Sequence, residues 1–216
     1  MYRLLFLLVS LVFISSCEKW NLKQPTHLNL NWRFHSTSNS QNSVTLDKGY
    51  VYCNGFELSG TRLKGDAVLI NQSTPSSKIQ FSAAPLNVTM DTPMGEYSII
   101  TLAALVDNSF SPCMRLEGQY VNGSTINPVV IEWKSSERLN FKTKSTYLFQ
   151  KKQDYNVYIG IDVEALLSSI SANFWSSASI TIDNGKPTIF INEYTNTNLF
   201  NKINQSLDSA LILQAD

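Results

Sequence analysis

The feature that most constrains the fold is a series of short stretches in which apolar and polar residues alternate. The first of them, HLNLNWRFH from His27 to His35, is apolar at every second position. A period of two buries one face of a stretch and leaves the other in water, which is typical of a β-strand. Gly, Asn, Ser and Pro separate the stretches, and this favours a β-sandwich. The other candidate strands span residues 44–46, 50–58, 67–70, 78–81, 86–90, 97–106, 114–121, 129–133, 139–149, 155–161, 180–182 and 188–191.

Two stretches in the second half of the chain have helical spacing instead. Apolar residues recur every three or four positions within 163–174 and again within 199–211. Asp162 is well placed as the N-cap of the first helix, and Thr195 or Asn196 as the N-cap of the second. We predict two amphipathic helices that pack on a sheet or close an open end of the sandwich. The fold class is therefore expected to be mainly β, with these two helices added.

The N-terminal residues have a different pattern. Arg3 precedes the apolar run LLFLLVSLVFI, whose 11 residues fall short of the roughly 20 that a membrane-spanning helix needs. The next residues, in Ile14-Ser15-Ser16-Cys17, follow the order of a bacterial lipobox: one aliphatic residue, two small ones and a cysteine. This order predicts lipidation of Cys17; an ordinary cleaved signal with a nearby cysteine is the alternative. The predicted division is a lipoprotein signal peptide at 1–16, a lipidated tether at 17–26 and a single β-rich domain at 27–216.

The predicted lipid places the chain in the cell envelope, most simply on the outer membrane, where it faces the periplasm or the cell surface. Each buried acyl CH₂ contributes about 0.8 kcal/mol, and two or more chains hold a protein stably. The chain has 17 basic and 17 acidic residues, and removal of residues 1–16 deletes only Arg3, which leaves 16 against 17. This near-zero charge argues against a nucleic-acid partner. The membrane is expected to be contacted through the N-terminal lipid.

Two cysteines remain after the predicted lipidation site. Cys53 and Cys113 form an even pair, and an oxidising compartment such as the envelope permits a disulfide between them. The alternative is two buried, independent thiols. Sequence alone does not show that their Cα atoms approach within the roughly 7 Å that a disulfide requires.

The histidines do not predict a metal or catalytic site. His27 and His35 share one face of a strand, but eight residues at about 3.3 Å each place them some 26 Å apart. They cannot ligate one metal ion, and neither has a carboxylate or thiol at ligand-like spacing. Neither a nucleotide-binding glycine loop nor a G-x-S-x-G turn occurs in the sequence. We therefore expect no cofactor, no metal and no catalytic residues.

Carboxylate pairs can support glycoside hydrolysis when their separation is suitable. The nearest candidates are Asp91 with Glu96, and Asp162 with Glu164. The first pair flanks a predicted turn. The second lies at a helix start, where acidic side chains interact favourably with the helix dipole. Structural roles thus account for all four residues.

The aromatic residues offer a binding surface at one place. Tyr50 and Tyr52 share a face of one predicted strand, opposite Val51 and Cys53. Such a pair could contact a sugar or a peptide, although ordinary cross-strand packing is the favoured explanation. Trp32 has the spacing of the apolar face and is predicted to lie in the core, as is Trp133.

One internal turn and its surroundings carry a resemblance. The stretch DTPMGEY places Asp91, Pro93, Gly95 and Tyr97 before a long apolar strand, and the closing stretch IFINEYTN precedes the last predicted helix. Together with the lipobox, this order resembles uncharacterised Bacteroidetes-type envelope lipoproteins. Their domain is an immunoglobulin- or transthyretin-like β-sandwich. The resemblance implies location and fold, and it carries over no catalytic residues.

These observations lead to three functional hypotheses. We expect a non-enzymatic binding or structural module of the envelope, with a protein or a glycan as its ligand. A second hypothesis is an anchored pilus or surface-fibre component, which would need an exchangeable strand; the C-terminal segment ALIL is short for that purpose. A third is an envelope glycan hydrolase, which would need converging carboxylates in a cleft.

Overall fold

A computed structural model describes residues 25–39, 43–81, 85–136, 138–143 and 145–215. The predicted signal peptide, the lipidation site Cys17 and nearly all of the tether lie outside these residues. In the described part, the fold is mainly β, with fourteen strands in one mixed sheet and three helices. None of these helices is long and apolar enough to cross a membrane.

The strands are β1 (Thr26–Ser36), β2 (Ser38–Asn39), β3 (Val44–Arg62), β4 (Val68–Gln80), β5 (Pro85–Thr92), β6 (Gly95–Val106), β7 (Met114–Asn122), β8 (Thr125–Trp133), β9 (Arg138–Thr143), β10 (Tyr147–Phe149), β11 (Asp154–Asp162), β12 (Ile180–Asp183), β13 (Lys186–Ile191) and β14 (Leu211–Ala215). The helices are α2 (Val163–Leu167), α3 (Ala172–Ser176) and α4 (Thr197–Ala210).

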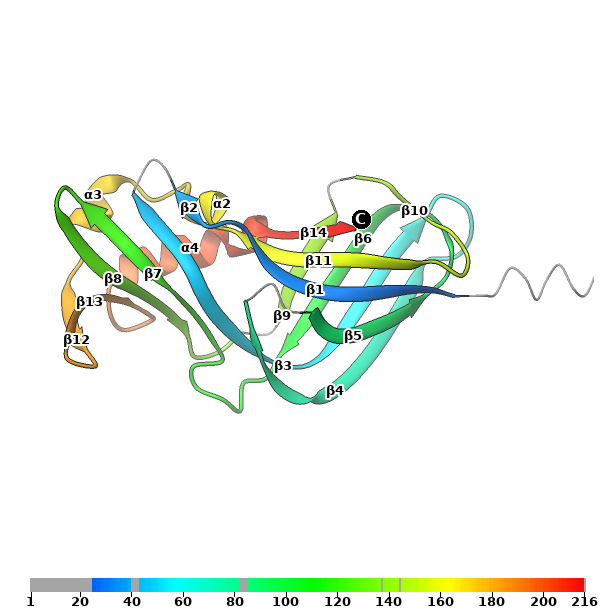
Figure 1. Ribbon diagram of the computed structural model, residues 1–216, viewed down its shortest axis with the longest axis horizontal. Coiled ribbons are helices and arrows are strands. Elements are labelled where there is room, and N and C mark those ends of the chain that lie inside the picture. The colour runs from blue at the N-terminus through cyan, green and yellow to red at the C-terminus, as the bar shows by residue number, and fades with distance from the viewer. Residues whose placement is uncertain (1–24, 40–42, 82–84, 137, 144, 216) are drawn as a thin grey trace, which may run out of the picture.

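The long strand β3 connects two parts of the sheet. Its residues 44–51 pair with β7, and residues 53–62 pair with β6 along the same edge. From β7 the sheet continues through β8 and β13 to β12, and from β6 it continues through β9, β14, β11 and β1 to β5. On the opposite edge, β4 pairs with residues 50–60. Figure 1 shows the two parts diverging from β3, with β12 and β13 near one end of the long axis and β10 near the other.

The core contains large aromatic side chains from both parts of the sheet. Trp32 is 1% exposed and stacks on Phe81, with ring centroids 4.6 Å apart. Trp133 is 2% exposed, and its indole Nε1 donates to Asn204 Oδ1 of α4 at 3.2 Å. The prediction that Trp32 and Trp133 lie in the core is confirmed. Trp175 of α3 is also buried, so the helices complete the same core as the strands.

The first predicted helix is only partly correct. Asp162 is its N-cap, as predicted, and accepts a hydrogen bond from Ala165 N at 3.1 Å. The helix ends at Leu167, however, and α3 begins separately at Ala172. Serines occupy the junction, and Ser168 Oγ donates to Ala165 O at 2.9 Å. Serine hydroxyls that bond back to the backbone compete with the helical ladder, which explains the break.

The second predicted helix is confirmed as α4, with Asn196 as its N-cap residue. It ends at Ala210, so the prediction that Leu211 belongs to the helix was wrong. Leu211 instead begins β14, which lies antiparallel to β11 and parallel to β9. The C-terminal segment is therefore an internal strand of the sheet, paired on both edges, and its alternate residues Leu211 and Leu213 are buried.

The predicted hairpin at the end of the sheet is confirmed. Strands β12 and β13 pair antiparallel, and Asn184 and Gly185 both have positive φ, of 49° and 78°. Asn-Gly is the dipeptide that such a two-residue turn favours. Three other strand pairs are parallel: β1–β11, β13–β8 and β14–β9. The sheet is consequently mixed, whereas hairpin-connected strands alone would give an antiparallel sheet.

Candidate functional site

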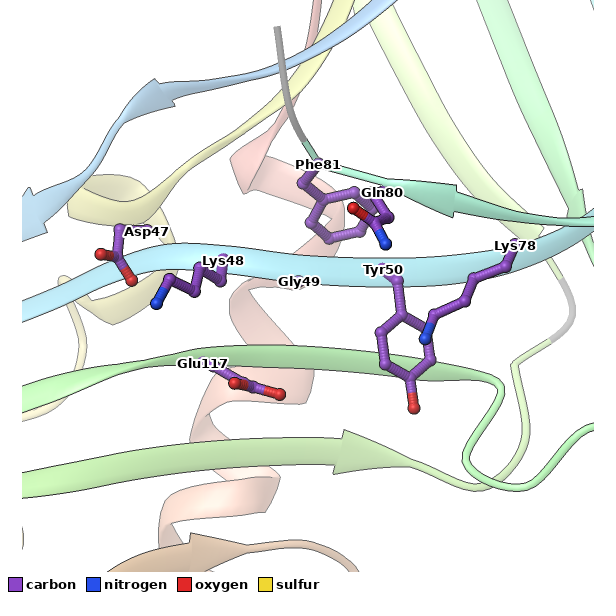
Figure 2. Close-up of a pocket in the computed structure, with 8 residues that line it drawn as sticks. All are labelled: Asp47, Lys48, Gly49, Tyr50, Lys78, Gln80, Phe81 and Glu117. Atoms are coloured by element: carbon purple, nitrogen blue, oxygen red, sulfur yellow. The ribbon is translucent and has the colours of Figure 1, made fainter. Parts of the chain in front are cut away.

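A pocket of about 520 Å³ opens at the edge of β3, between the end of β4 and β7. Figure 2 shows Tyr50 and Lys78 at one end of the pocket. Asp47 and Lys48 of β3 and Glu117 of β7 lie toward the other end. Its lining residues are Asp47, Lys48, Gly49, Tyr50, Lys78, Gln80, Phe81 and Glu117.

The pocket lies where β3 changes its partner. On this edge β2 pairs with residues 44–45, and β4 pairs with residues 50–60. In the described part of the chain, no strand pairs with the intervening residues 46–49 on this edge. A bulge relative to β7 falls in the same stretch, and it leaves both Asp47 and Lys48 exposed. A bulge of this kind redirects side chains out of the regular alternation.

The floor of the pocket requires a glycine. A Cβ atom added to Gly49 would lie 2.6 Å from Arg115 O and 2.9 Å from Phe81 Cδ2. The Phe81 backbone N–H donates to Gly49 O at 2.9 Å, which holds the end of β4 against β3. Because the Phe81 ring stacks on buried Trp32, the floor is continuous with the core.

An aromatic row forms one wall of the pocket and continues beyond it. The Lys78 ammonium lies 3.8 Å from the centroid of the Tyr50 ring, and Tyr50 meets Tyr52 edge to face at 5.6 Å. Tyr52 in turn stacks on Phe110, with centroids 4.0 Å apart. The two tyrosines are half-buried while Val51 and Cys53 are buried, which agrees with the prediction that Tyr50 and Tyr52 share a face opposite those two residues. We call these three rings, Tyr50, Tyr52 and Phe110, the aromatic row.

A charged network holds the opposite rim. Arg115 of β7 contacts Glu117 at 2.6 Å and Glu132 of β8 at 2.5 Å, and its guanidinium lies 3.7 Å from Asp183. Burial lowers the pKa of Arg115, but the hydrogen bonds and charges of Glu117 and Glu132 raise it above the ordinary value. Arg115 therefore stays charged and fixes Glu117 at the rim of the pocket.

The surroundings of Tyr50 determine the protonation of its hydroxyl. Burial raises the pKa of Tyr50 above the ordinary value, although the nearby Arg115 charge lowers it. The phenol is accordingly neutral at physiological pH and can both donate and accept a hydrogen bond. The pocket thus combines a flat apolar ring with neutral, acidic and basic hydrogen-bonding groups. This chemistry suits binding of a polar ligand that also presents an apolar face.

A second pocket, of about 390 Å³, lies at the start of α4. The Asn196 side chain spans it: its amide nitrogen donates to Ser179 O and to Phe190 O, at 2.9 and 2.8 Å. These bonds tie the segment between α3 and β12, and also β13, to the start of α4, which is a structural role. The pocket is lined by Phe174, Ser177, Ala178, Ser179, Asn196, Thr197, Asn198 and Leu199.

The residues that the sequence singled out for chemistry are dispersed. His27 Nδ1 lies 2.7 Å from Asp91 Oδ1 in an exposed pair between β1 and β5, while His35 is exposed near the other end of β1. Glu96 is exposed at the start of β6, and Asp162 caps α2. Among the described residues, no group of His, Cys, Asp or Glu is arranged to hold a metal ion.

Cys53 lies on β3, and Cys113 lies in the loop that leads into β7. Both Cys53 and Cys113 are buried free thiols, and Tyr52 N donates to Cys113 O at 2.9 Å. Burial raises the pKa of Cys53 to about 12, with smaller contributions from Cys113 and Asp107. A disulfide between them stays a prediction.

Sequence reasoning missed most of the pocket. Lys78 and Glu117 come from strands far apart in the chain, and only the pairing of β3 with both strands brings them beside Tyr50. The one usable signal was the Tyr50–Tyr52 pair itself. No family model, curated protein or solved structure matches the chain. The chemistry of the pocket is therefore the main guide to function.

Proposed function

We propose that this chain is an envelope lipoprotein, anchored through Cys17 in the outer membrane, whose domain binds a glycan at the Tyr50 pocket. The proposal describes a non-enzymatic binding module. The single observation that carries it is the open pocket in which the Tyr50 ring stands beside Lys78 and opposite Glu117. The predicted lipobox supports the anchor.

A glycan suits the pocket for two reasons. The C–H face of a sugar ring packs on an aromatic ring, and sugar hydroxyls both donate to carboxylates and accept from ammonium and amide groups. The pocket offers Asp47 and Glu117 as acceptors and Lys78 and Gln80 as donors. Its volume of about 520 Å³ falls within the range of small-ligand sites.

An extended peptide is less well suited to this place. Peptides that add to a sheet bind through the free backbone groups of an edge strand. At the pocket, Leu46 N already donates to Thr37 O, and Gly49 O already accepts from Phe81 N, each at 2.9 Å. These bonds occupy backbone groups that an added strand would use. Side-chain recognition of a sugar does not need them.

The immunoglobulin- or transthyretin-like sandwich remains part of the proposal. It is supported by β3, whose two halves pair with diverging parts of the sheet (Figure 1), and by the single core cluster to which both parts contribute. The three parallel strand pairs are a departure from a purely antiparallel sandwich.

The glycan proposal is tested with the lipidated chain in detergent micelles on a glycan array, followed by calorimetry with the glycans that bind. Tyr50→Ala is expected to weaken binding about five- to 150-fold, since loss of one stacked ring costs on the order of 1–3 kcal/mol. Tyr194→Ala is the matched control, because Tyr194 also lies under a lysine, 4.4 Å from Lys134 Nζ. Equal binding by the two variants would contradict the proposal. Cleavage of a bound glycan would instead favour the hydrolase hypothesis.

The anchor is tested by fractionation of intact cells. The native chain is expected in the membrane fraction, and Cys17→Ala is expected to leave it, because the acyl chains supply the membrane affinity. Protease treatment of intact cells then places the domain on the surface if it is digested, and in the periplasm if digestion needs lysis. Retention of Cys17→Ala in the same membrane fraction would contradict lipid anchoring.

A further inference from the structure

Four large apolar side chains are exposed near the end of the molecule at which β1 begins. Leu63, Leu69, Ile99 and Leu148 are each more than half exposed, at 56%, 65%, 55% and 59%. They belong to the loop after β3 and to strands β4, β6 and β10. We call this end the proximal end and these four residues the proximal patch.

Strand register places two of the four on one outer face. Ser59 of β3 faces Leu69 of β4, and Thr61, two residues further on, faces Ile99 of β6. Residues that face each other across neighbouring strands lie on the same side of a sheet, and so do residues two apart in one strand. Leu69 and Ile99 are therefore exposed on the same face, with only the two small residues of β3 between them.

The other two members flank one residue of β6. The Leu63 backbone N–H donates to Glu96 O at 2.8 Å, and Leu148 of β10 faces Glu96 from the other side. Glu96 and Ile99 are both exposed, and buried Tyr97 and Ile100 point to the core. The proximal patch thus continues across β3, β6 and β10, with the Glu96 carboxylate within it.

The N-terminal segment joins the domain at this same end. Thr26 Oγ1 donates to Gln150 O, and His27 N donates to Gln153 O at 3.1 Å, so the start of β1 lies against the loop that follows β10. Figure 1 shows β1 beginning at the end of the molecule that carries β10. Eight residues separate Cys17 from Thr26, and an extended segment of this length reaches at most about 30 Å. A lipid on Cys17 would hold the proximal end near the bilayer.

We infer that the proximal patch rests on the lipid surface of the membrane that holds Cys17. The inference depends on the proposed lipid anchor. Apolar side chains that the anchor brings to a bilayer gain by leaving water for the boundary between headgroups and acyl chains. The contact stays at headgroup depth, because charged groups are costly deeper in the bilayer. These charged groups are Glu96 within the patch and the exposed Lys64, Lys151 and Lys152 around it.

Contact between the proximal patch and the membrane, which we call the seating of the domain, determines the orientation of the domain. Ile126, Ile180 and Ile182 are also exposed, at 61%, 53% and 70%, but they belong to β8 and β12 at the opposite end. That end carries the hairpin β12–β13 and points away from the membrane. The second apolar group therefore serves as an internal control, because it has the same chemistry and no nearby anchor.

The test uses the lipidated chain reconstituted into vesicles of phosphatidylethanolamine and phosphatidylglycerol. An environment-sensitive fluorophore is attached to Leu148→Cys in one sample and to Ile182→Cys in another; Cys53 and Cys113 are buried. Nitroxide-labelled lipid near the headgroups is expected to quench the probe at 148 at least about threefold more than the probe at 182. Adding Leu63→Ser and Leu69→Ser should reduce quenching at 148, whereas Ile126→Ser should not.

The other possible results separate failure of the membrane contact from failure of the lipid anchor. Equal quenching at the two positions, or stronger quenching at 182, with the chain in the vesicle fraction overturns the seating and leaves the anchor intact. Recovery of the chain outside the vesicle fraction overturns the anchor and the seating together. Unchanged quenching at 148 in the double serine variant also overturns the seating, because the patch would then make no contact with lipid.

Discussion

Tyr50 and Tyr194 each lie under a lysine ammonium, at 3.8 and 4.4 Å from the ring centroid, yet their surroundings differ. Tyr50 is on β3 between two paired strands, with Arg115 and Gln80 directly opposite it. Tyr194 is in a loop and is 76% exposed. A tyrosine–lysine pair becomes a candidate binding site where neighbouring strands supply walls and further polar groups. The same pair in a loop is only a surface contact.

The largest expected effect comes from filling the floor of the pocket. Gly49→Val is expected to destabilise the fold by about 2–3 kcal/mol, because an added side chain meets the Arg115 backbone and the buried Phe81 ring. The urea midpoint measures it. Gly123→Ala is the control: its added Cβ meets nothing within 4 Å, but its φ is +59°, so only about 1 kcal/mol is expected. Similar losses in both variants would show that the floor is not tightly packed.

The second-largest expected effect is the loss of stability when the Arg115 guanidinium at the rim of the pocket is removed. Arg115→Gln leaves Glu117, Glu132 and Asp183 without their shared cation, and we expect a loss of about 1–3 kcal/mol in unfolding free energy. Glycan affinity should fall as well, because Glu117 loses its fixed position. Arg138→Gln, which breaks the more exposed pair with Glu57, should cost less than about 1 kcal/mol. A reversed order would argue against a structured rim.

Alkaline pH tests the burial of Tyr50 directly. Burial raises its pKa above the ordinary 10.0, so the folded chain holds the phenol proton more tightly than the unfolded chain. That stabilisation is full below pH 10 and is lost as the pH rises through the folded pKa. Tyr50→Phe should therefore show a shallower fall in urea midpoint above about pH 10. Tyr194→Phe controls for the loss of one phenol, and identical slopes in all three proteins would contradict the expectation.

The smallest expected effect is the difference in coupling energy between the two lysine–tyrosine pairs, Lys78–Tyr50 and Lys134–Tyr194. Lys78→Ala and Lys134→Ala each remove a cation from a tyrosine ring, which is worth about 0.5–1 kcal/mol at partly exposed sites. We expect a larger coupling with Tyr50 than with Tyr194 in double-mutant cycles, since the Tyr50 ring is less exposed. Only Lys78→Ala should alter glycan binding. Equal coupling energies would mean that the strands around Tyr50 do not strengthen the pair.

Several parts of the fold followed from local sequence. The period-two stretch from His27 to His35 is a strand, Asp162 caps a helix, and Asn184-Gly185 forms the predicted turn. Trp32 lies in the core, as its spacing predicted. These features depend on side chains within a few residues of one another, which is why a single sequence determines them.

The pocket and the outer surfaces depended on tertiary structure. Lys78, Gln80 and Glu117 meet Tyr50 only because β4 and β7 pair with β3 in a particular register. Local pattern does not encode that register, because each alternating stretch could pair with several others. Likewise, Leu211 continues a helical spacing but is buried as a strand between β11 and β9. The sequence determined which stretches form strands; long-range packing decided which side chains meet, since contacts between distant strands are specified by the whole core.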